Sequence, residues 1–258
     1  MKLSKSLYTR AIQCQKSLWL KKHNKDVLTP PNAAAQAIFQ NGNEVGDLAC
    51  KLFPNGVEIP YLNTTFQDKI DLTQEYINQG TQNIYEATFE FDGILIMIDI
   101  LNIKDNSVII NEVKSSTQVK DIYLHDASIQ YYVLNGLGYD VKKVNIIHIN
   151  NEYVRDEELD INQLFSVVDV TYEVKELQAN IKNNLEMFRK TLAKEDEPNI
   201  DIGTHCNDPY ECDAKNYCWS HIPNYSIFDI SRLKSQKKFE LYQNGILEFS
   251  QIKDINSF

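Results

Sequence analysis

The chain has 258 residues and carries 26 basic against 36 acidic side chains, so its formal net charge is −10. This charge argues against a non-specific nucleic-acid coat, because binding a polyanion requires local positive charge. It leaves open an enzyme with a basic cleft or bound divalent metal ions. No apolar run approaches the roughly 20 residues that span a bilayer, and the N-terminus shows no secretory signal. We therefore expect a cytoplasmic protein without a membrane partner, in which disulfides are disfavoured.

The first third of the chain shows helical periodicity. In the first helix Cys14 shares a face with apolar residues, so its thiol is expected to turn toward the interior. Asn32 is the predicted N-cap of the second helix, and Thr64-Thr-Phe-Gln67 predicts a capping box at the start of the third. The three predicted helices cover residues 3–24, 33–52 and 64–79.

The middle of the chain changes to β-branched and aromatic residues, which favour strands. Lys104-Asp105-Asn106 predicts a turn between two of them. Helices are expected over residues 121–137 and 171–194. This order predicts an α/β fold, with a mixed central β-sheet flanked by helices. The predicted strands cover residues 83–91, 94–103, 107–113, 143–149 and 164–170.

Three polar side chains of this sheet form the first candidate site. Asp99 stands near the predicted end of an apolar strand, where an aspartate is costly to bury without a partner or a metal. Glu112 and Lys114 are two residues apart on the next strand, so they share a face, and a hairpin would bring them beside Asp99. Metal-dependent phosphodiester cleavage needs such carboxylates and a cation. The alternative is an exposed charge pair on a strand.

Clustered cysteines form the second candidate site. In a cytoplasmic protein they favour ligation of a metal or cluster, and their spacing suits three thiolates around one inorganic centre. Cys14 is a candidate fourth ligand from the other end of the chain. Zinc, with His205 or His221 as a ligand, remains an alternative, although the Cys-x-x-Cys pair that zinc sites favour is absent. A further alternative is that the four cysteines are unrelated buried thiols. The three clustered residues, with five residues between each and the next, are Cys206, Cys212 and Cys218.

Together these motifs resemble the PD-(D/E)XK nuclease superfamily, in the RecB-like branch that carries a four-cysteine iron–sulfur cluster and includes CRISPR-associated exonucleases. Asp99 matches the aspartate of the motif, and Glu112-Val-Lys114 matches its Glu-x-Lys. The segment from Asp126 to Gln130 resembles the glutamine helix of that branch. One cysteine precedes this core and three follow it, which is the order of the branch.

The resemblance implies a restriction-endonuclease-like fold with an iron–sulfur clasp joining the N- and C-terminal segments. It implies a DNA nuclease, an exonuclease on single strands or DNA ends, in DNA repair or phage defence. Asp99 and Glu112 would bind Mg²⁺ or Mn²⁺, Lys114 would orient or activate the attacking water, and Gln130 would assist. The four ligands of the structural 4Fe–4S cluster would be Cys14, Cys206, Cys212 and Cys218.

The chain departs from the family pattern at three places. Position 134, where the glutamine helix of the branch often has a tyrosine, is leucine. The branch often has a histidine metal ligand on an early helix, where this chain has none; Glu44 or Glu86 would take its place. The first C-terminal cysteine spacing is five residues, where relatives usually have two. These departures keep two other functions open: an inactive nuclease fold that binds nucleic acid or protein, and a redox-sensing iron–sulfur protein.

The expected organisation is a nuclease domain with its cysteine segment over residues 1–222 and a helical extension over residues 223–258. The extension contains a short helix that ends at Gly245. It is expected to be the start of a further, fused C-terminal domain or a contact for a protein partner.

Overall fold

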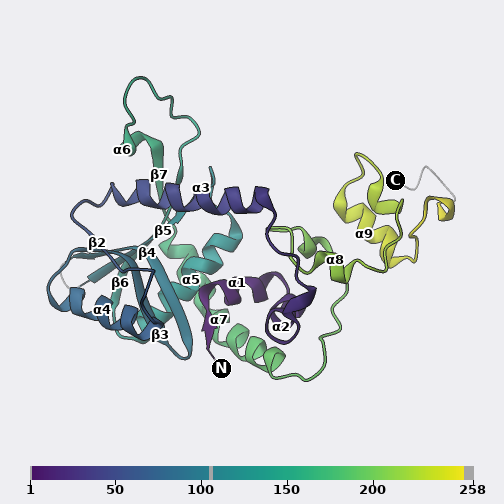
Figure 1. The fold of residues 1–258 in the computed structure, drawn as a ribbon, viewed down its shortest axis with the longest axis horizontal. Helices are drawn as coiled ribbons and strands as arrows, with labels where there is room; N and C mark the ends of the chain where they lie inside the picture. The colour runs from purple at the N-terminus through teal and green to yellow at the C-terminus, as the bar shows by residue number, and fades with distance from the viewer. Residues whose placement is uncertain (1, 105–106, 253–258) are drawn as a thin grey trace. The chain divides into compact units, whose positions relative to one another are not determined.

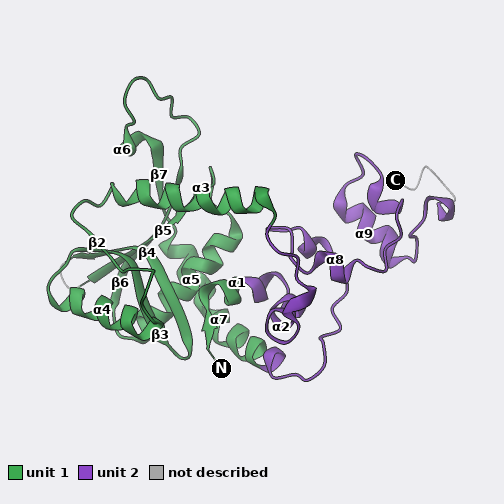
Figure 2. Cartoon of the chain, viewed as in Figure 1, with its two compact units in different colours: residues 1–9, 32–189 green, residues 10–31, 190–258 purple. Residues whose placement is uncertain are grey.

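A computed structural model describes residues 2–104 and 107–252 (Figure 1). The chain forms two compact units, each built from segments that are distant in sequence (Figure 2). The first unit combines residues 1–9 with 32–189, and the second combines residues 10–31 with 190–258. The predicted division after residue 222 differs from these unit boundaries and stays a prediction. No helix of the described residues is long and apolar enough to cross a membrane.

A mixed seven-stranded sheet forms the centre of the first unit, as the sequence predicts. Its order is β2-β3-β4-β5-β6-β7, with β1 beside β4. β3, β4 and β5 are antiparallel neighbours, β5 and β6 are parallel, and β7 returns antiparallel to β6. The strands are β1 (Leu3–Ser4), β2 (Val57–Glu58), β3 (Asn83–Phe91), β4 (Ile94–Lys104), β5 (Ser107–Lys114), β6 (Asp140–Ile149) and β7 (Phe165–Asp169).

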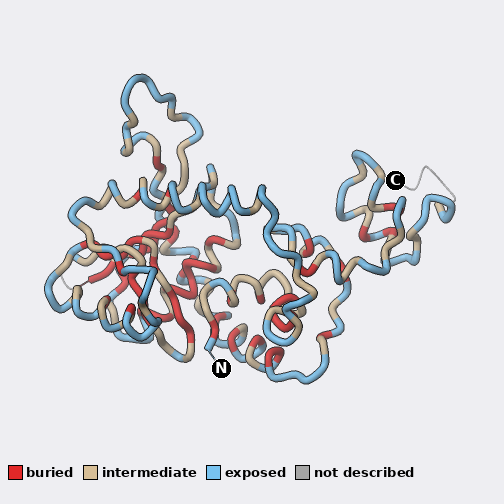
Figure 3. Tube along the Cα trace, in the orientation of Figure 1, coloured by how far each residue is buried: buried red, intermediate tan, exposed pale blue. Residues whose placement is uncertain are grey.

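Helices flank this sheet. Val45 and Ala49 of α3 pack with Ile100 on one face, and the buried residues concentrate in and around the strands (Figure 3). Helix α1 (Lys5–Gln13) runs from the first unit into the second. The other helices of the first unit are α3 (Ala33–Cys50), α4 (Phe66–Asn78), α5 (Asp121–Gly136), α6 (Ile161–Leu164) and most of α7 (Thr171–Leu192). The second unit contains α2 (Gln15–His23), α8 (Lys215–Cys218) and α9 (Ser235–Gln243), with four 3₁₀ turns at Lys25–Val27, Thr204–Cys206, Ile227–Asp229 and Phe249–Gln251.

The predicted single helix over residues 3–24 is wrong. Its first residues form β1, and Cys14 interrupts the remainder with extended backbone (φ −161°). The Cys14 N–H still donates to Arg10 O, and the Cys14 carbonyl accepts from Leu18 N. Helix α1 therefore ends and α2 begins at this one residue. The Cys14 side chain, which the spacing predicts to face the interior, is only partly buried.

Smaller differences concern helix and strand ends. The capping box of α4 uses Thr65 with Asp68 and not Thr64 with Gln67, because Thr65 is the residue with N-cap geometry. Asp99 lies in the middle of β4 and not near its end, since that strand continues to Lys104. The predicted N-cap Asn32 is confirmed. The predicted turn at Lys104-Asp105-Asn106 falls largely on residues 105–106, which lie outside the described residues.

Candidate active site

Strand β4 exchanges one neighbour for another midway along its length. Its first residues pair with β1 (Leu3 with Ile94), whereas β5 pairs with it only from Ile100, opposite Asn111. Asp99 lies where β4 changes its neighbour from β1 to β5, a place that we call the fork of β4. Its Oδ2 accepts a hydrogen bond of 2.7 Å from the backbone N–H of Val113, beyond the last residue of β5 that pairs with β4. The carboxylate therefore satisfies a backbone donor that the ladder leaves unpaired.

Glu112 is the centre of a charged cluster beside this fork. Its side chain is only 1% exposed. One oxygen accepts from Lys114 Nζ at 2.6 Å and the other from Gln130 Nε2 at 2.7 Å. Lys5 Nζ donates to both oxygens, at 2.9 and 3.0 Å. The structure thus brings Asp99, Glu112, Lys114 and Gln130 together, and it adds Lys5 from the N-terminus.

Asp126 on α5 completes the cluster. Lys114 Nζ donates to its Oδ2 at 2.6 Å, so this ammonium lies between Glu112 and Asp126. Lys5 Nζ lies 3.6 Å from the other oxygen, Oδ1, and 3.9 Å from Asp99 Oδ1. Asp126 Oδ1 and Gln130 Oε1 are both buried without a hydrogen-bond partner. The cluster therefore has more acceptor oxygens than its own donors satisfy.

Lys5 and Asp126 belong to this cluster although no motif in the sequence predicts them there. Lys5 follows a strand of two residues, which is too short for any alternating pattern to predict. Asp126 stood in the segment that resembles the glutamine helix. It is four residues before Gln130, and residues four apart share a helix face. That spacing is the signal that could have identified it.

The cluster shifts the ionisation of its members. Burial, reinforced by Glu112, raises the pKa of Asp99 to about 7, although Lys5 and Lys114 oppose the shift. Burial would also raise the pKa of Glu112, but Lys114 and Lys5 hold it well below its usual range. Despite burial, the carboxylates raise the pKa of both lysines. Glu112 is therefore an anion, both lysines are cations, and Asp99 titrates near neutrality.

The two acidic residues predicted to replace the family histidine lie in different places. Glu86 and Asp99 lie between the β3–β4 pairs Tyr85–Ile100 and Ala87–Ile98 and are not themselves paired. Glu86 has a left-handed backbone (φ +56°) that is uncommon for glutamate. Burial raises its pKa, and the charges of Lys5 and Glu112 also act on it, so its carboxyl is close to the cluster. Glu44 is exposed on α3 and accepts from Gln40 of the same helix at 3.0 Å.

The side of the sheet also separates Glu44 from the cluster. Ile100 pairs with Asn111 and packs against α3, so Glu112, the next residue of β5, faces the other side. Gln130 of α5 reaches Glu112 on that side. Among the residues that the structure describes, no hydrogen bond or ion pair joins Glu44 to this cluster.

Across residues 2–104 and 107–252, no three or more His, Cys, Asp or Glu side chains are arranged to hold a metal ion. In the acidic cluster, the Lys5 ammonium lies among the carboxylates of Asp99, Glu112 and Asp126. These are oxygen donors of the type that Mg²⁺ and Mn²⁺ prefer. The oxygen ligands fit a divalent ion, and the Lys5 ammonium occupies the position between these carboxylates.

The second unit contains the four cysteines predicted to bind a cluster, together with residues that fasten their segments. Arg10 donates to both carboxylate oxygens of Asp213, each at 2.7 Å. Gln13 Nε2 donates to the carbonyls of His205 at 2.8 Å and Tyr210 at 2.7 Å. These bonds join the helix before Cys14 to the cysteine segment near the C-terminus, so the two segments fold together.

The thiols of this unit lie within electrostatic range of one another, and all five cysteines of the chain are free. Hydrogen bonds to Cys14 and Cys206 raise the pKa of His205 to about 10. Burial opposes thiolate formation at both cysteines, but the bond from His205 lowers the pKa of each. Burial raises the pKa of Cys218 to about 11, and the charges of Cys206, Cys212 and Cys14 add to the shift. His205 thus contacts two of the predicted ligands.

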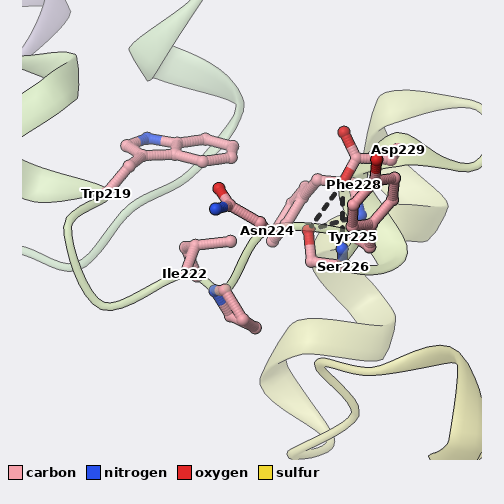
Figure 4. Close-up of a pocket in the computed structure, with 8 residues that line it drawn as sticks. Trp219, Ile222, Asn224, Tyr225, Ser226, Phe228 and Asp229 are labelled. Carbon is pink, nitrogen blue, oxygen red and sulfur yellow. Dashed lines mark hydrogen bonds between the residues drawn. The ribbon is translucent and has the colours of Figure 1, made fainter.

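A pocket of about 570 Å³ also lies in the second unit (Figure 4). Trp219 and Phe228 pack edge to face, with ring centroids 4.6 Å apart. Asp229 accepts from the backbone N–H of Ser226 at 2.9 Å, which closes a capping box. The lining residues are Trp219, Ile222, Pro223, Asn224, Tyr225, Ser226, Phe228 and Asp229.

No protein-family model matches this chain, and no curated protein matches its sequence. Among solved structures, it is similar to an alkaline exonuclease from Laribacter hongkongensis, with a TM-score of 0.42 and 14% identity over 74% of this chain and 87% of that one. The same exonuclease in complex with dAMP gives a TM-score of 0.42 and 13% identity over the same shares. A phage-related exonuclease from Haemophilus somnus 129PT gives a TM-score of 0.31 and 13% identity over 69% of this chain and 92% of that one. The identities are low, and the roles of individual residues rest on the geometry described above.

Proposed function

We propose that this protein is a metal-dependent DNA nuclease, an exonuclease on single strands or DNA ends in the cytoplasm, with its active site at Asp99, Glu112 and Lys114. The observation that supports this function is the convergence of three carboxylates and two ammonium groups at the fork of β4. Taking so many charges out of water is costly and is weak support for stability. Ionisable groups with strongly shifted pKa values cluster at functional sites.

A divalent ion is the cofactor that this reaction requires. Asp99 and Glu112 would hold it, with Glu86 as the next carboxylate. Two features support binding of a divalent ion here: the ligands are carboxylate oxygens, and a cation, the Lys5 ammonium, already lies among them. When bound, the ion would supply Lewis acidity toward a phosphate oxygen and an activated water.

The other residues position and compensate charge. Lys114 Nζ donates to Glu112 and to Asp126, each at 2.6 Å, so the position of its ammonium group is fixed. A preorganised cation of this kind stabilises the negative charge that develops on a cleaved phosphodiester. Gln130 donates to Glu112 and fixes the orientation of that carboxylate.

The decisive experiment measures cleavage of end-labelled single-stranded DNA in Mn²⁺. Asp99→Ala and Lys114→Ala are each expected to lower the rate by at least about 10³-fold, because the first removes a ligand of the divalent ion and the second removes the cation that stabilises charge on the phosphate. Lys143→Ala is the matched control, since it removes an exposed ion pair with Asp169 from the same sheet. Cleavage at the wild-type rate in both site variants would eliminate this function.

We further propose that Cys14, Cys206, Cys212 and Cys218 bind a structural 4Fe–4S cluster. Their common location in one unit, their free thiols and the bonds that fasten both segments support this proposal. Zinc is the alternative occupant, with His205 in place of one thiolate. The visible spectrum of anaerobically purified protein separates the two, because a 4Fe–4S cluster absorbs visible light and zinc does not.

One observation favours a second function, a nuclease fold that binds nucleic acid or protein without cutting. Lys5 already neutralises the carboxylates that a catalytic metal would need. Titration of Mn²⁺ discriminates between the two functions. A binding module takes up the ion weakly or not at all, whereas the nuclease binds it at the concentrations that support cleavage.

A further inference from the structure

Lys5 Nζ lies in a cage of carboxylate oxygens that belong to three different elements. The two oxygens of Glu112 on β5 are 2.9 and 3.0 Å away. Asp126 Oδ1 on α5 is 3.6 Å away, and Asp99 Oδ1 on β4 is 3.9 Å away. Four oxygens around a single cation form the environment of a cation-binding site, which is here filled by a side chain of the protein.

The ammonium satisfies this cage only in part. It has three protons, and two of them are directed to Glu112. The remaining oxygens lie beyond hydrogen-bond length, and Asp126 Oδ1 is buried without a hydrogen-bond partner. Gln130 Oε1, on a side chain that is fully buried beside Glu112, also lacks a partner. Mg²⁺ and related divalent ions bind about six oxygens, so the unused acceptors match the needs of such an ion better than those of an ammonium.

The backbone on both sides of Lys5 is fixed, whereas its side chain reaches the surface. The segment before it is fixed, because β1 pairs with β4 and Leu3 is buried. The segment after it is fixed by Tyr8, whose ring packs 5.6 Å from Phe188. The Lys5 side chain itself is 21% exposed and has a flexible four-carbon stem. A change of its rotamers would empty the cage.

We infer that this cage is a divalent-cation site in which Asp126 is a ligand beside Asp99 and Glu112, and in which Lys5 is an internal competitor that the ion must displace. The inference rests on the proposed function and adds a ligand and a competition to it. Lys114 shares one cage oxygen, Glu112 Oε1, with Lys5, but its second bond, to Asp126 Oδ2 at 2.6 Å, lies outside the cage and does not depend on Lys5. The metal affinity is then set by the difference between the free energies with which the divalent ion and the Lys5 ammonium bind the same oxygens.

The test is direct binding of Mn²⁺ to the full chain, followed by electron paramagnetic resonance and calorimetry. Lys5→Met is expected to bind Mn²⁺ at least about tenfold more tightly than the wild type, because a competing charge at contact distance is removed. Lys2→Met is the matched control: it removes a lysine from the same segment, one that is 71% exposed and pairs with Glu90. Asp126→Asn, added to Lys5→Met, is expected to reverse the gain.

Equal affinities in Lys5→Met and Lys2→Met would overturn the competition and leave the nuclease proposal standing. The same gain with and without Asp126→Asn would overturn the role of Asp126. Absence of Mn²⁺ binding in every variant would overturn both the inference and the metal-dependent function. If Lys5→Met fails to fold, Lys5→Arg provides the test, because it keeps the charge and the carboxylate contact. That variant is expected to bind Mn²⁺ no more tightly than the wild type, and tighter binding contradicts the competition.

Discussion

The Asp99 carboxyl is the group of the candidate site whose charge changes near neutral pH, since burial and Glu112 raise its pKa to about 7. A divalent ion binds the carboxylate and not the protonated acid. At subsaturating Mn²⁺, cleavage is therefore expected to fall about tenfold per pH unit below this pKa and to level off above it. A pH–rate profile measures the effect. The Lys143→Ala control should give the same profile, and a rate that rises on acidification would contradict the assignment.

Glu86 is the second residue-scale feature. A non-glycine residue with left-handed backbone is strained, and such strain persists where the surrounding structure enforces it. Here the β3–β4 pairs on either side, Tyr85 with Ile100 and Ala87 with Ile98, hold Glu86 and Asp99 between them. Its position makes it a better candidate than Glu44 for the acidic residue that replaces the missing histidine.

At the scale of elements, the junction between the N-terminal helices and the cysteine segment depends on a few polar bonds. Arg10 makes a bidentate ion pair with Asp213 and also donates to Ser17 Oγ at 2.7 Å. Arg10→Ala is expected to lower the free energy of unfolding by about 2 kcal/mol, because hydrogen bonds to charged groups contribute more than neutral ones. Urea denaturation measures this change.

Lys215→Ala is the comparison for that variant. Lys215 pairs with Glu211, four residues before it, and the Glu211 side chain is 73% exposed. Removal of such a surface pair is expected to cost about 0.5 kcal/mol or less. Equal losses in the two variants would show that the Arg10 pair has no special part in joining the two segments.

At the scale of the whole molecule, the charged cluster and the four cysteines belong to different compact units. Cys212→Ala is therefore expected to abolish the visible absorption of the cluster, whereas Asp99→Ala should retain it. Cys50→Ala is the matched control, because Cys50 packs against a hydrophobic core cluster of the first unit. Absorption spectra and iron content measure the outcome. Full iron content in Cys212→Ala would exclude this cysteine as a ligand.

The sequence by itself determined the features that depend on local periodicity. Alternation along a strand places Glu112 and Lys114 on one side, and the hairpin brings them beside Asp99. Strand composition also predicted β3 to β7 and the mixed sheet, because apolar β-branched runs reflect burial. The catalytic roles of these residues and of the cysteines stay predictions.

Only the tertiary structure decided which distant residues complete the site. Lys5 reaches Glu112 across a separation of 107 residues, through a strand of two residues that carries no readable pattern. Cys14 lies on an apolar helical face by spacing, yet its backbone is extended and interrupts the helix there. Local sequence specifies which face a side chain shares with its neighbours. The partners on that face come from pairing and packing between distant segments, and these set whether the carboxylates enclose an ammonium or a metal ion.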